Sequence, residues 1–401
     1  MLLAAAVFTL GGWLLKAQCT APWAGYHQYE SLCYNDIQAL YVARGVDLHT
    51  FPYVHGGLSP AGLTGGAIEY PVLTGLFMWA SGLLASDLNG YLVISALLLA
   101  PWALFVSWLL ARMAGWRALM WAAAPSLVLY AFHNWDLLAV ACAVAGLYAW
   151  WRGAPVWAGV LFGLGGAFKL YPAIFLLPLA ADCLVSSDGR KTFRALAAGT
   201  GVMAAANLPF ALKNFGGWSA TYRFHSLRGA DFNSLWHWVA PDLSVGALNT
   251  LSTALTAAFW AAALGFGYTR ARRDGTYPFL GVCAALLASL LLWTKVHSPQ
   301  YALWLLPFFV LLRVRVSWWV LYSLADLAVY VGIFRWFYDL SARGLDATLA
   351  KDLLVAGVGA RALLLALLFV VFLRAPTGTG EERPAPQSVS QAPARLARAG
   401  P

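Results

Sequence analysis

The stretch LLAVACAVAGLYAWWRGAPVWAGVLFGLGGAFKLYPAIFLLPLAADCLV, residues 137–185, consists of three apolar runs separated by short polar breaks. The runs cover 137–151, 154–168 and 171–185, and Arg152 and Lys169 mark the breaks between them. Runs of 15 residues approach the length that crosses the hydrocarbon core of a bilayer. The period-2 alternation that strands of a membrane barrel require is absent, so each run predicts a membrane-spanning helix.

Apolar runs of this kind continue along most of the chain. The 401 residues are 61% hydrophobic and 11% charged, whereas an average soluble domain is about 45–50% apolar and about 25% charged. This composition excludes a water-soluble globule, a disordered chain, a collagen and a disulfide-stabilised miniprotein. We therefore predict an all-α polytopic membrane protein with about 12 transmembrane helices. The predicted spans are 2–18, 91–112, 117–132, 137–151, 154–168, 171–185, 195–212, 246–268, 278–294, 302–314, 317–334 and 352–373.

Basic residues mark one side of these spans. Lys and Arg collect in the short connections 112–117, 152, 190–194, 270–273 and 313–315, and cytoplasmic loops of membrane proteins are enriched in these residues. The long connections 19–90 and 213–245 are then extracytoplasmic. This asymmetry accounts for the net charge of +9, so no nucleic-acid partner is expected. Lys16, at the outer end of the first span, does not fit the rule.

The orientation depends on the segment 71–86. It is predicted to be a re-entrant or interfacial helix, because a spanning helix there would invert every later loop. The first span has neither the basic region nor the cleavage site of a signal peptide and is expected to be retained. Residues 1–374 form the predicted transmembrane domain. Residues 375–401, rich in Pro, Ala, Gly and Gln, are predicted to be a disordered cytoplasmic tail.

Asp36 is the candidate for a catalytic carboxylate. It lies in CYNDIQALYVARG, residues 33–45, within the first long outer connection. A carboxylate held at the membrane surface can take the proton of an acceptor hydroxyl that comes within about 3 Å. The alternative is a helix N-cap, a position that Asp favours. Arg44, at the end of the same run, is a candidate substrate contact.

Other polar residues of the outer connections are candidates for binding sugar hydroxyls. Glu69 and Tyr70 precede Pro71, so Glu69 either begins a helix whose first position is proline or contacts substrate. The turn HNWD, residues 133–136, contains Asn134 as a further candidate, whereas Asp136 is interpreted as structural.

Cations of the outer turns could stabilise a phosphate group as it leaves. Lys169 either extends to lipid head groups or contacts phosphate. The turn KVHSPQY, residues 295–301, holds Lys295 and His297, which are candidates for the same role because cations lower the cost of the developing negative charge. For His297, the alternative is a structural role at the end of a span. Gln300 and Tyr301 are candidate substrate contacts.

Two further pairs have structural interpretations. Asp326 and Arg361 lie near the middles of the last two predicted spans, at matching depths, and an unpaired charge there is costly, so we predict that they pair. Cys19 and Cys33 are both in the first outer connection, where a disulfide or two free thiols are equally compatible with the sequence. A bridge would fix the segment just before Asp36.

Motifs for a cytoplasmic nucleotide site or a metal centre are absent from the sequence. There is no Walker loop, no GxGxxG after a strand, no HExxH, no GxSxG and no Cys/His metal spacing. No cofactor and no metal are therefore expected.

The arrangement of four segments resembles glycosyltransferase family 87, the actinobacterial membrane mannosyltransferases of the GT-C superfamily. The segments are YNDIQALYVARG (34–45), EYPVLTG (69–75), NWDLLAVACAVAGLYAWWRG followed by GVLFGLGGAFKLYP (134–153 and 159–172), and HSPQYALWLLP (297–307). The resemblance implies a multi-pass cell-membrane enzyme that uses a polyprenyl-phosphate sugar, typically mannose, as co-substrate on the outer face. It also implies inversion at the sugar carbon, with Asp36 as the base, no metal, and His297 near the donor phosphate. The resemblance also implies site roles for Lys169 and Glu69. It does not imply which acceptor, a glycolipid or a glycan, is used.

Two rival functions remain compatible with a polytopic chain. A transporter or lipid-linked sugar flippase without transferase activity would show two related halves and ionisable residues near the midplane. Asp326 and Arg361 meet the second expectation, but the sequence has no related halves. The other rival is a non-catalytic assembly protein, which a sugar-transfer assay would distinguish from an enzyme.

Overall fold

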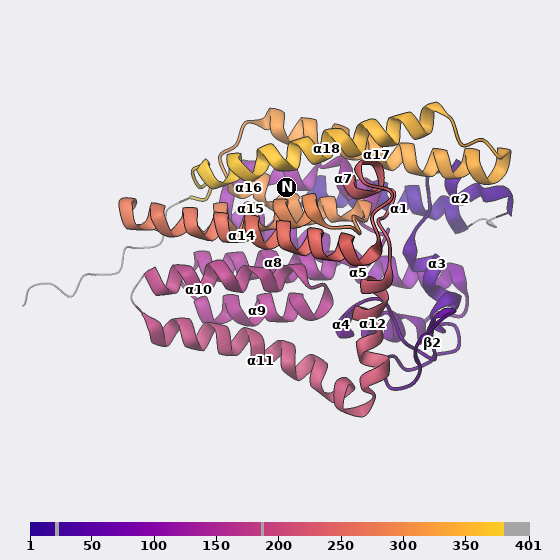
Figure 1. The fold of residues 1–401 in the computed structure, drawn as a ribbon, viewed down its shortest axis with the longest axis horizontal. Coiled ribbons are helices and arrows are strands. Elements are labelled where there is room, and N and C mark those ends of the chain that lie inside the picture. Colours follow the sequence, from indigo (N-terminus) through magenta and orange to yellow (C-terminus); the bar gives the residue numbers. More distant parts are fainter. Residues whose placement is uncertain (21–23, 186–187, 381–401) are drawn as a thin grey trace, which may run out of the picture.

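Residues 1–20, 24–185 and 188–380 are described by the computed structural model, and helices dominate it (Figure 1). Within this part of the chain, six helices are long and apolar enough to cross a membrane. They coincide with six of the predicted spans, which confirms the all-α polytopic class. These helices are α1 (Leu2–Ala17), α5 (Leu88–Ala114), α11 (Gly189–Lys213), α14 (Val245–Asp274), α17 (Val316–Arg343) and α18 (Leu349–Arg374).

Shorter apolar helices fill the space between the long ones. Helices α8, α15 and α16 are buried along nearly their whole length. A helix enclosed by protein on every side is apolar all round, which explains why these segments show no polar face in the sequence. The shorter helices are α8 (Asp136–Trp151), α9 (Pro155–Phe168), η4 (Tyr171–Phe175) with α10 (Leu176–Val185), α15 (Phe279–Trp293), and η5 (Pro299–Tyr301) with α16 (Ala302–Leu311).

The predicted span 117–132 is not one helix. It is divided into η3 (Gly115–Ala118), α6 (Leu119–Ala122) and α7 (Pro125–Tyr130). Pro125 is the first residue of α7, and Ala124 before it has an extended backbone with ψ of 134°. The break follows from proline, which has no N–H to donate and disfavours the helical conformation of the preceding residue. The prediction of a single span here is wrong.

The two long connections meet at one end of the bundle, on the right in Figure 1. Asn214 donates from its amide to the carbonyl of Gly56 over 3.2 Å, and Thr221 donates to the carbonyl of Ile68 over 2.7 Å. The elements that build this end are η1 (Gln18–Thr20), η2 (Ala24–Tyr26), α2 (His27–Glu30), α3 (Asp36–Ala43), the antiparallel strands β1 (Gly57–Ser59) and β2 (Gly62–Thr64), α4 (Val72–Gly82), α12 (Phe215–Leu227) and α13 (Leu235–Val239).

The segment 71–86 contains only one helix, α4. Its 11 residues rise about 16 Å, roughly half the thickness of a bilayer core. Thr74 of α4 donates to the carbonyl of Phe168 over 2.6 Å, at the C-terminal end of α9. A helix this short cannot cross a bilayer core by itself, and the orientation that depends on this segment stays a prediction.

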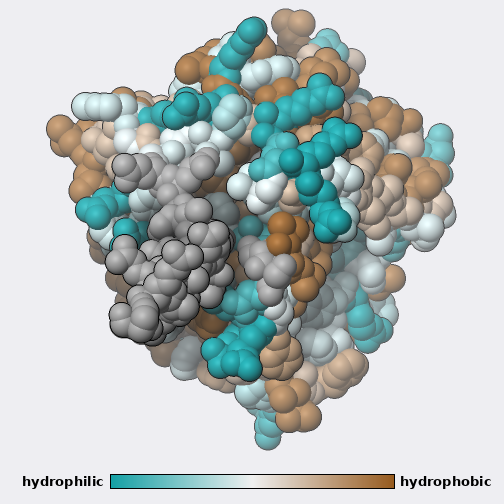
Figure 2. All heavy atoms as spheres, turned by 90° about the vertical axis from the view of Figure 1, so that its left-hand side faces the viewer, coloured by the Kyte–Doolittle hydropathy of each residue, from teal (hydrophilic) through white to brown (hydrophobic). Residues whose placement is uncertain are grey.

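The basic connections meet at the opposite end, which Figure 2 views directly and where hydrophilic patches lie among apolar side chains. Arg117 donates to the carbonyls of Phe309, Val310 and Leu312 at 2.6 to 2.9 Å. Arg270 donates to the carbonyl of Leu373 over 3.2 Å. The structure thus groups these connections at one end, as the charge pattern predicts.

The predicted tail begins later than residue 375. The N–H of Gly378 donates to the carbonyl of Leu311 over 2.7 Å, and the N–H of Gly380 donates to that of Met113 over 3.0 Å. These hydrogen bonds give residues 375–380 fixed partners, so the prediction of disorder is wrong for them. The prediction for residues 381–401 lies outside the described residues.

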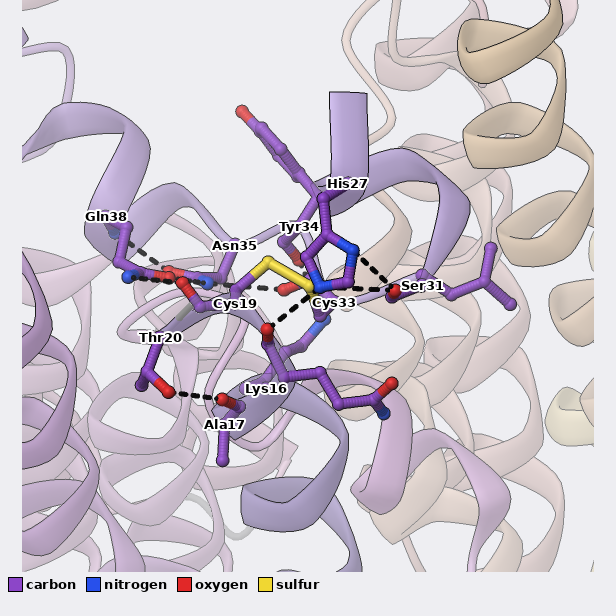
Figure 3. The surroundings of a disulfide bond; sticks show 12 residues. Lys16, Ala17, Cys19, Thr20, His27, Ser31, Cys33, Tyr34, Asn35 and Gln38 are labelled. Carbon is purple, nitrogen blue, oxygen red and sulfur yellow. Dashed lines mark hydrogen bonds between the residues drawn. A yellow bond between two sulfur atoms is a disulfide. The ribbon is translucent and has the colours of Figure 1, made fainter. Parts of the chain in front are cut away.

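A disulfide joins Cys19 to Cys33, with Cα atoms 5.5 Å apart (Figure 3). The pairing that the sequence left open is therefore present. Gln38 donates from its amide to the carbonyl of Cys19 over 3.1 Å, and Lys16 donates to the carbonyl of Tyr34 over 2.8 Å. Together these contacts hold the segment before Asp36 against the end of α1.

Candidate functional site

Asp36 is the first residue of α3, and Asn35 is its N-cap. The Asn35 side chain accepts a hydrogen bond from the N–H of Gln38 over 2.8 Å. The N–H of Asp36 donates to the carbonyl of His133 over 2.8 Å. Because Asn35 caps the helix, the alternative of Asp36 as the N-cap is wrong, and the Asp36 carboxylate remains available for another role.

Asn134 lies at the centre of the site. Its side-chain N–H₂ donates to Oδ2 of Asp36 over 2.7 Å and to the hydroxyl of Tyr70 over 2.7 Å. Its side-chain oxygen accepts from Nζ of Lys169 over 3.0 Å and from the N–H of Trp135 over 2.6 Å. Asn134 is fully buried, and all four of these bonds stay within the protein. The structure therefore makes Asn134 a bridge between the carboxylate and the lysine.

Lys169 points inward from the end of α9. Its side chain is 6% exposed and lies 3.5 Å from Oδ2 of Asp136, which is fully buried. Its Nζ also lies 4.0 Å from the centre of the Tyr70 ring, a cation–π distance. The alternative in which Lys169 extends to lipid head groups is therefore wrong. Asp136 also accepts a hydrogen bond from the Trp304 indole over 2.7 Å, and its structural role stays a prediction.

Burial raises the pKa of Asp36 above its usual range, while the hydrogen bond from Asn134 and the charge of Lys169 act in the opposite direction. Tyr34 contributes a further donor, its hydroxyl lying 3.2 Å from Oδ1. A base is most effective when its pKa lies close to the working pH. The surroundings of Asp36 therefore suit a carboxylate that accepts a proton.

Glu69 and Arg44 form an ion pair beside this cluster. The Arg44 guanidinium donates to both carboxylate oxygens of Glu69, over 2.6 and 2.9 Å. His225 of α12 lies 2.8 Å from the carbonyl of Glu69 through Nε2. Such a two-point pair holds its partners in a fixed geometry. Glu69 and Arg44 were predicted as separate substrate contacts, and the structure shows that they form an ion pair with each other.

The 295–301 turn lies at the same end of the bundle but does not contact Asp36 directly. Stacked rings and polar contacts connect the two: His297 stacks on Tyr301 at 6.0 Å, and Tyr301 stacks on Trp304 at 3.7 Å. Trp304 then bonds to Asp136, which pairs with Lys169. His297 therefore reaches the lysine only through intermediates.

The remaining groups of that turn have protein partners or face inward. Lys295 donates to the carbonyl of Arg228 over 2.6 Å. His297 is 3% exposed, and its Nδ1 lies 2.8 Å from the carbonyl of Leu291. Gln300 is also buried. In the described part of the chain, Nε2 of His297 and Oε1 of Gln300 have no hydrogen-bond partner.

The predicted pair of Asp326 and Arg361 is confirmed. Their side chains are 3.6 Å apart and almost completely buried. Ser126 donates to the other oxygen of Asp326 over 3.1 Å, and Arg361 donates to the carbonyl of Asn233 over 2.6 Å. Asp326 thus links α17 to α7, and Arg361 links α18 to the 213–245 connection, which fits a structural role.

Lys16 is the residue that sequence reasoning left unexplained. It is fully buried and donates to the carbonyl of Tyr34 and to the hydroxyl of Tyr330, each over 2.8 Å. It also lies 3.4 Å from Nδ1 of His133. Lys16 therefore contacts the residue pair on either side of Asp36: Tyr34, two residues before it in the chain, and His133, whose carbonyl accepts from the Asp36 N–H. A charged residue inside a span, which needs an internal partner, was the available signal.

The sequence model of Glycosyltransferase family 87 matches residues 68–299, more than half of the 401 residues. The matched range includes Asn134 and Lys169 but begins after Asp36. Neither the curated proteins nor the solved structures contain a match.

Proposed function

Because the chain belongs to glycosyltransferase family 87, we propose that this membrane glycosyltransferase moves a hexose, mannose, from a polyprenyl-phosphate donor to a hydroxyl of a glycolipid or glycan. The reaction takes place at the end of the bundle that carries α3 and α12, on the extracytoplasmic face of the cell membrane. The observation that carries the proposal is the Asp36 carboxylate, bound by Asn134 and Tyr34 and close to the buried cation of Lys169.

The reaction is a direct displacement at the anomeric carbon. The acceptor oxygen forms a bond to that carbon and passes its proton to the Asp36 carboxylate. The bond between the carbon and the phosphate oxygen breaks, and its electron pair leaves with the polyprenyl phosphate. One inversion results, because attack and departure occur on opposite sides of the sugar. A lipid-linked donor supplies the activated sugar, so the displacement needs no other reactant.

Cations lower the cost of the charge that develops on the leaving phosphate. Lys169 is connected to Asp36 through Asn134, and the proposal assigns it, with Lys295 and His297, to the donor phosphate. Lys295 already donates to the carbonyl of Arg228. Nδ1 of His297 lies against the carbonyl of Leu291, and its Nε2 is proposed to meet the phosphate. Arg44, Glu69, Tyr70, Gln300 and Tyr301 are proposed to contact the sugars.

A transfer assay with the purified full-length chain tests the proposal. Synthetic polyprenyl-phosphate mannose, polyprenyl-phosphate glucose and a nucleotide-linked mannose are each offered with an extract of envelope glycolipids and glycans. We expect stoichiometric release of polyprenyl phosphate and labelled acceptor from the mannose lipid only. Transfer from the nucleotide donor would contradict the proposed donor. Movement of the intact sugar lipid across vesicles without transfer would favour a flippase.

Removal of the Asn134 amide should shift the pH dependence of transfer. In Asn134→Ala, the ionised form of Asp36 loses a hydrogen-bond donor, so its pKa rises further above the usual range. A hydrogen bond to a charged group contributes about 1.5–3 kcal/mol, which corresponds to a shift of about 1 pH unit or more. Transfer requires the ionised carboxylate, so activity should fall at a higher pH as the solution is acidified.

The acid limb of kcat/KM against pH measures this shift. Asn249→Ala is the matched control, since Asn249 lies at the same end of the bundle and its side chain donates to the carbonyl of Ser226, away from Asp36. Its profile should equal that of the unmodified enzyme. An Asn134→Ala profile that falls in amplitude but keeps its acid limb would show that Asn134 does not act through the Asp36 carboxylate.

A further inference from the structure

A groove lies at the end of the bundle opposite α12, between the C-terminal ends of α14 and α18. Its volume is about 300 Å³, and Figure 2 views this end of the molecule. It is lined by Phe266, Thr269, Arg270, Arg273, Asp274 and Arg374. None of these residues belongs to the site around Asp36, so the proposed transfer reaction does not use the groove.

The groove has an excess of positive charge. Its three arginines and one aspartate give a formal charge of +2. Arg270 is already paired, with Asp274 over 3.1 Å and with the carbonyl of Leu373 over 3.2 Å. Arg273 and Arg374 are exposed, and no ion pair links either of them to another described residue. Both arginines line the groove, and within residues 1–20, 24–185 and 188–380 their guanidinium donors are unpaired, which suits a phosphate oxyanion.

An apolar surface continues from the groove along α14. Of the most apolar 18-residue stretch of this helix, only 11% is buried. Phe266 forms part of the groove lining. Ala262 and Ala258, one and two turns before Phe266 on the same side of the helix, are exposed. A ligand that fills the groove and continues along α14 would carry an anionic group followed by apolar chains. A free phosphate ion would use the arginines but not this surface.

We propose that this groove binds the head group of an anionic phospholipid, with the phosphate on Arg273 and Arg374 and the acyl chains along the exposed face of α14. Basic pockets between transmembrane helices recognise anionic lipid head groups in this way. Arg270 is held in place by Asp274 and lines the side of the pocket. The lipid would join α14 to α18 at this end of the bundle.

Native mass spectrometry of the full-length chain tests the proposal. Phosphatidylglycerol and phosphatidylcholine with identical acyl chains are titrated into the detergent-solubilised protein. We expect phosphatidylglycerol, but not phosphatidylcholine, to be retained as one tightly bound copy. The double variant R273Q/R374Q should weaken that binding on the order of 20-fold, since each basic side chain near an anionic lipid contributes about fivefold.

The control removes two exposed charges from the same end but outside the groove. Arg190 and Arg194 lie at the start of α11 and are exposed, and R190Q/R194Q should bind phosphatidylglycerol as the unmodified chain does. An equal loss in the control, equal retention of phosphatidylcholine, or displacement of the lipid by inorganic phosphate would each overturn the proposal. If R273Q/R374Q does not fold, the single variant R273Q should still weaken binding about fivefold.

Discussion

Asp36→Asn should abolish sugar transfer while leaving the fold intact. The amide cannot accept the proton of the attacking hydroxyl, and a positioned base contributes about 10²–10⁴-fold to the rate. The unfolding temperature should stay equal or rise slightly. Burial disfavours the ionised carboxylate, as its raised pKa indicates, so a neutral amide avoids that cost. Turnover of polyprenyl-phosphate mannose and thermal unfolding of the same preparation measure both effects.

The control for this variant is another aspartate on the same end of the bundle. Asp242 lies in the 213–245 connection and is exposed, so Asp242→Asn removes one negative charge without altering the cluster. We expect its turnover to match the unmodified enzyme. If Asp36→Asn retained turnover close to that of Asp242→Asn, Asp36 would not be the base.

Lys169→Met should reduce both activity and stability. Methionine has nearly the length of lysine but leaves the Asp136 carboxylate buried without its cation, and breaking a buried ion pair costs about 3 kcal/mol or more. Asn134 loses a donor at the same time, so the bridge to Asp36 is no longer fixed. We expect transfer to fall about 100-fold, the loss that follows removal of one preorganised donor. Denaturant unfolding and initial rates measure the two effects.

Lys191→Met provides the comparison for stability. Lys191 also pairs with an aspartate, Asp188, at 2.8 Å, but its side chain is 64% exposed. Exposed ion pairs contribute about 0–1 kcal/mol, so this variant should unfold almost as the unmodified chain does. If the two lysine variants were destabilised equally, burial of the Lys169 pair would not contribute to stability.

The pair of Asp326 and Arg361 shows how far residue chemistry extends without coordinates. Asp326 and Arg361 were paired from their matching depths in two predicted spans, and the structure places them 3.6 Å apart. The argument works because an unpaired charge in a membrane is costly enough to leave few alternatives. The same argument predicts that Lys16 has an internal partner, but it does not identify the partner. Its partners, Tyr34 and Tyr330, come from distant parts of the chain.

The sequence by itself determined the all-α membrane class, six of the long apolar helices and the division of the loops between two ends. Apolar length and basic clustering are local properties, so they can be read along the chain. The tertiary structure decided which polar side chains meet. It brings Asn134 to Asp36 across 98 residues and to Lys169 across 35, and it turns Arg44 and Glu69 toward each other. It also divides the predicted span 117–132 at Pro125 and gives residues 375–380 hydrogen-bond partners. These contacts depend on how helices pack, and packing is set by the shapes of surfaces that lie far apart in the chain.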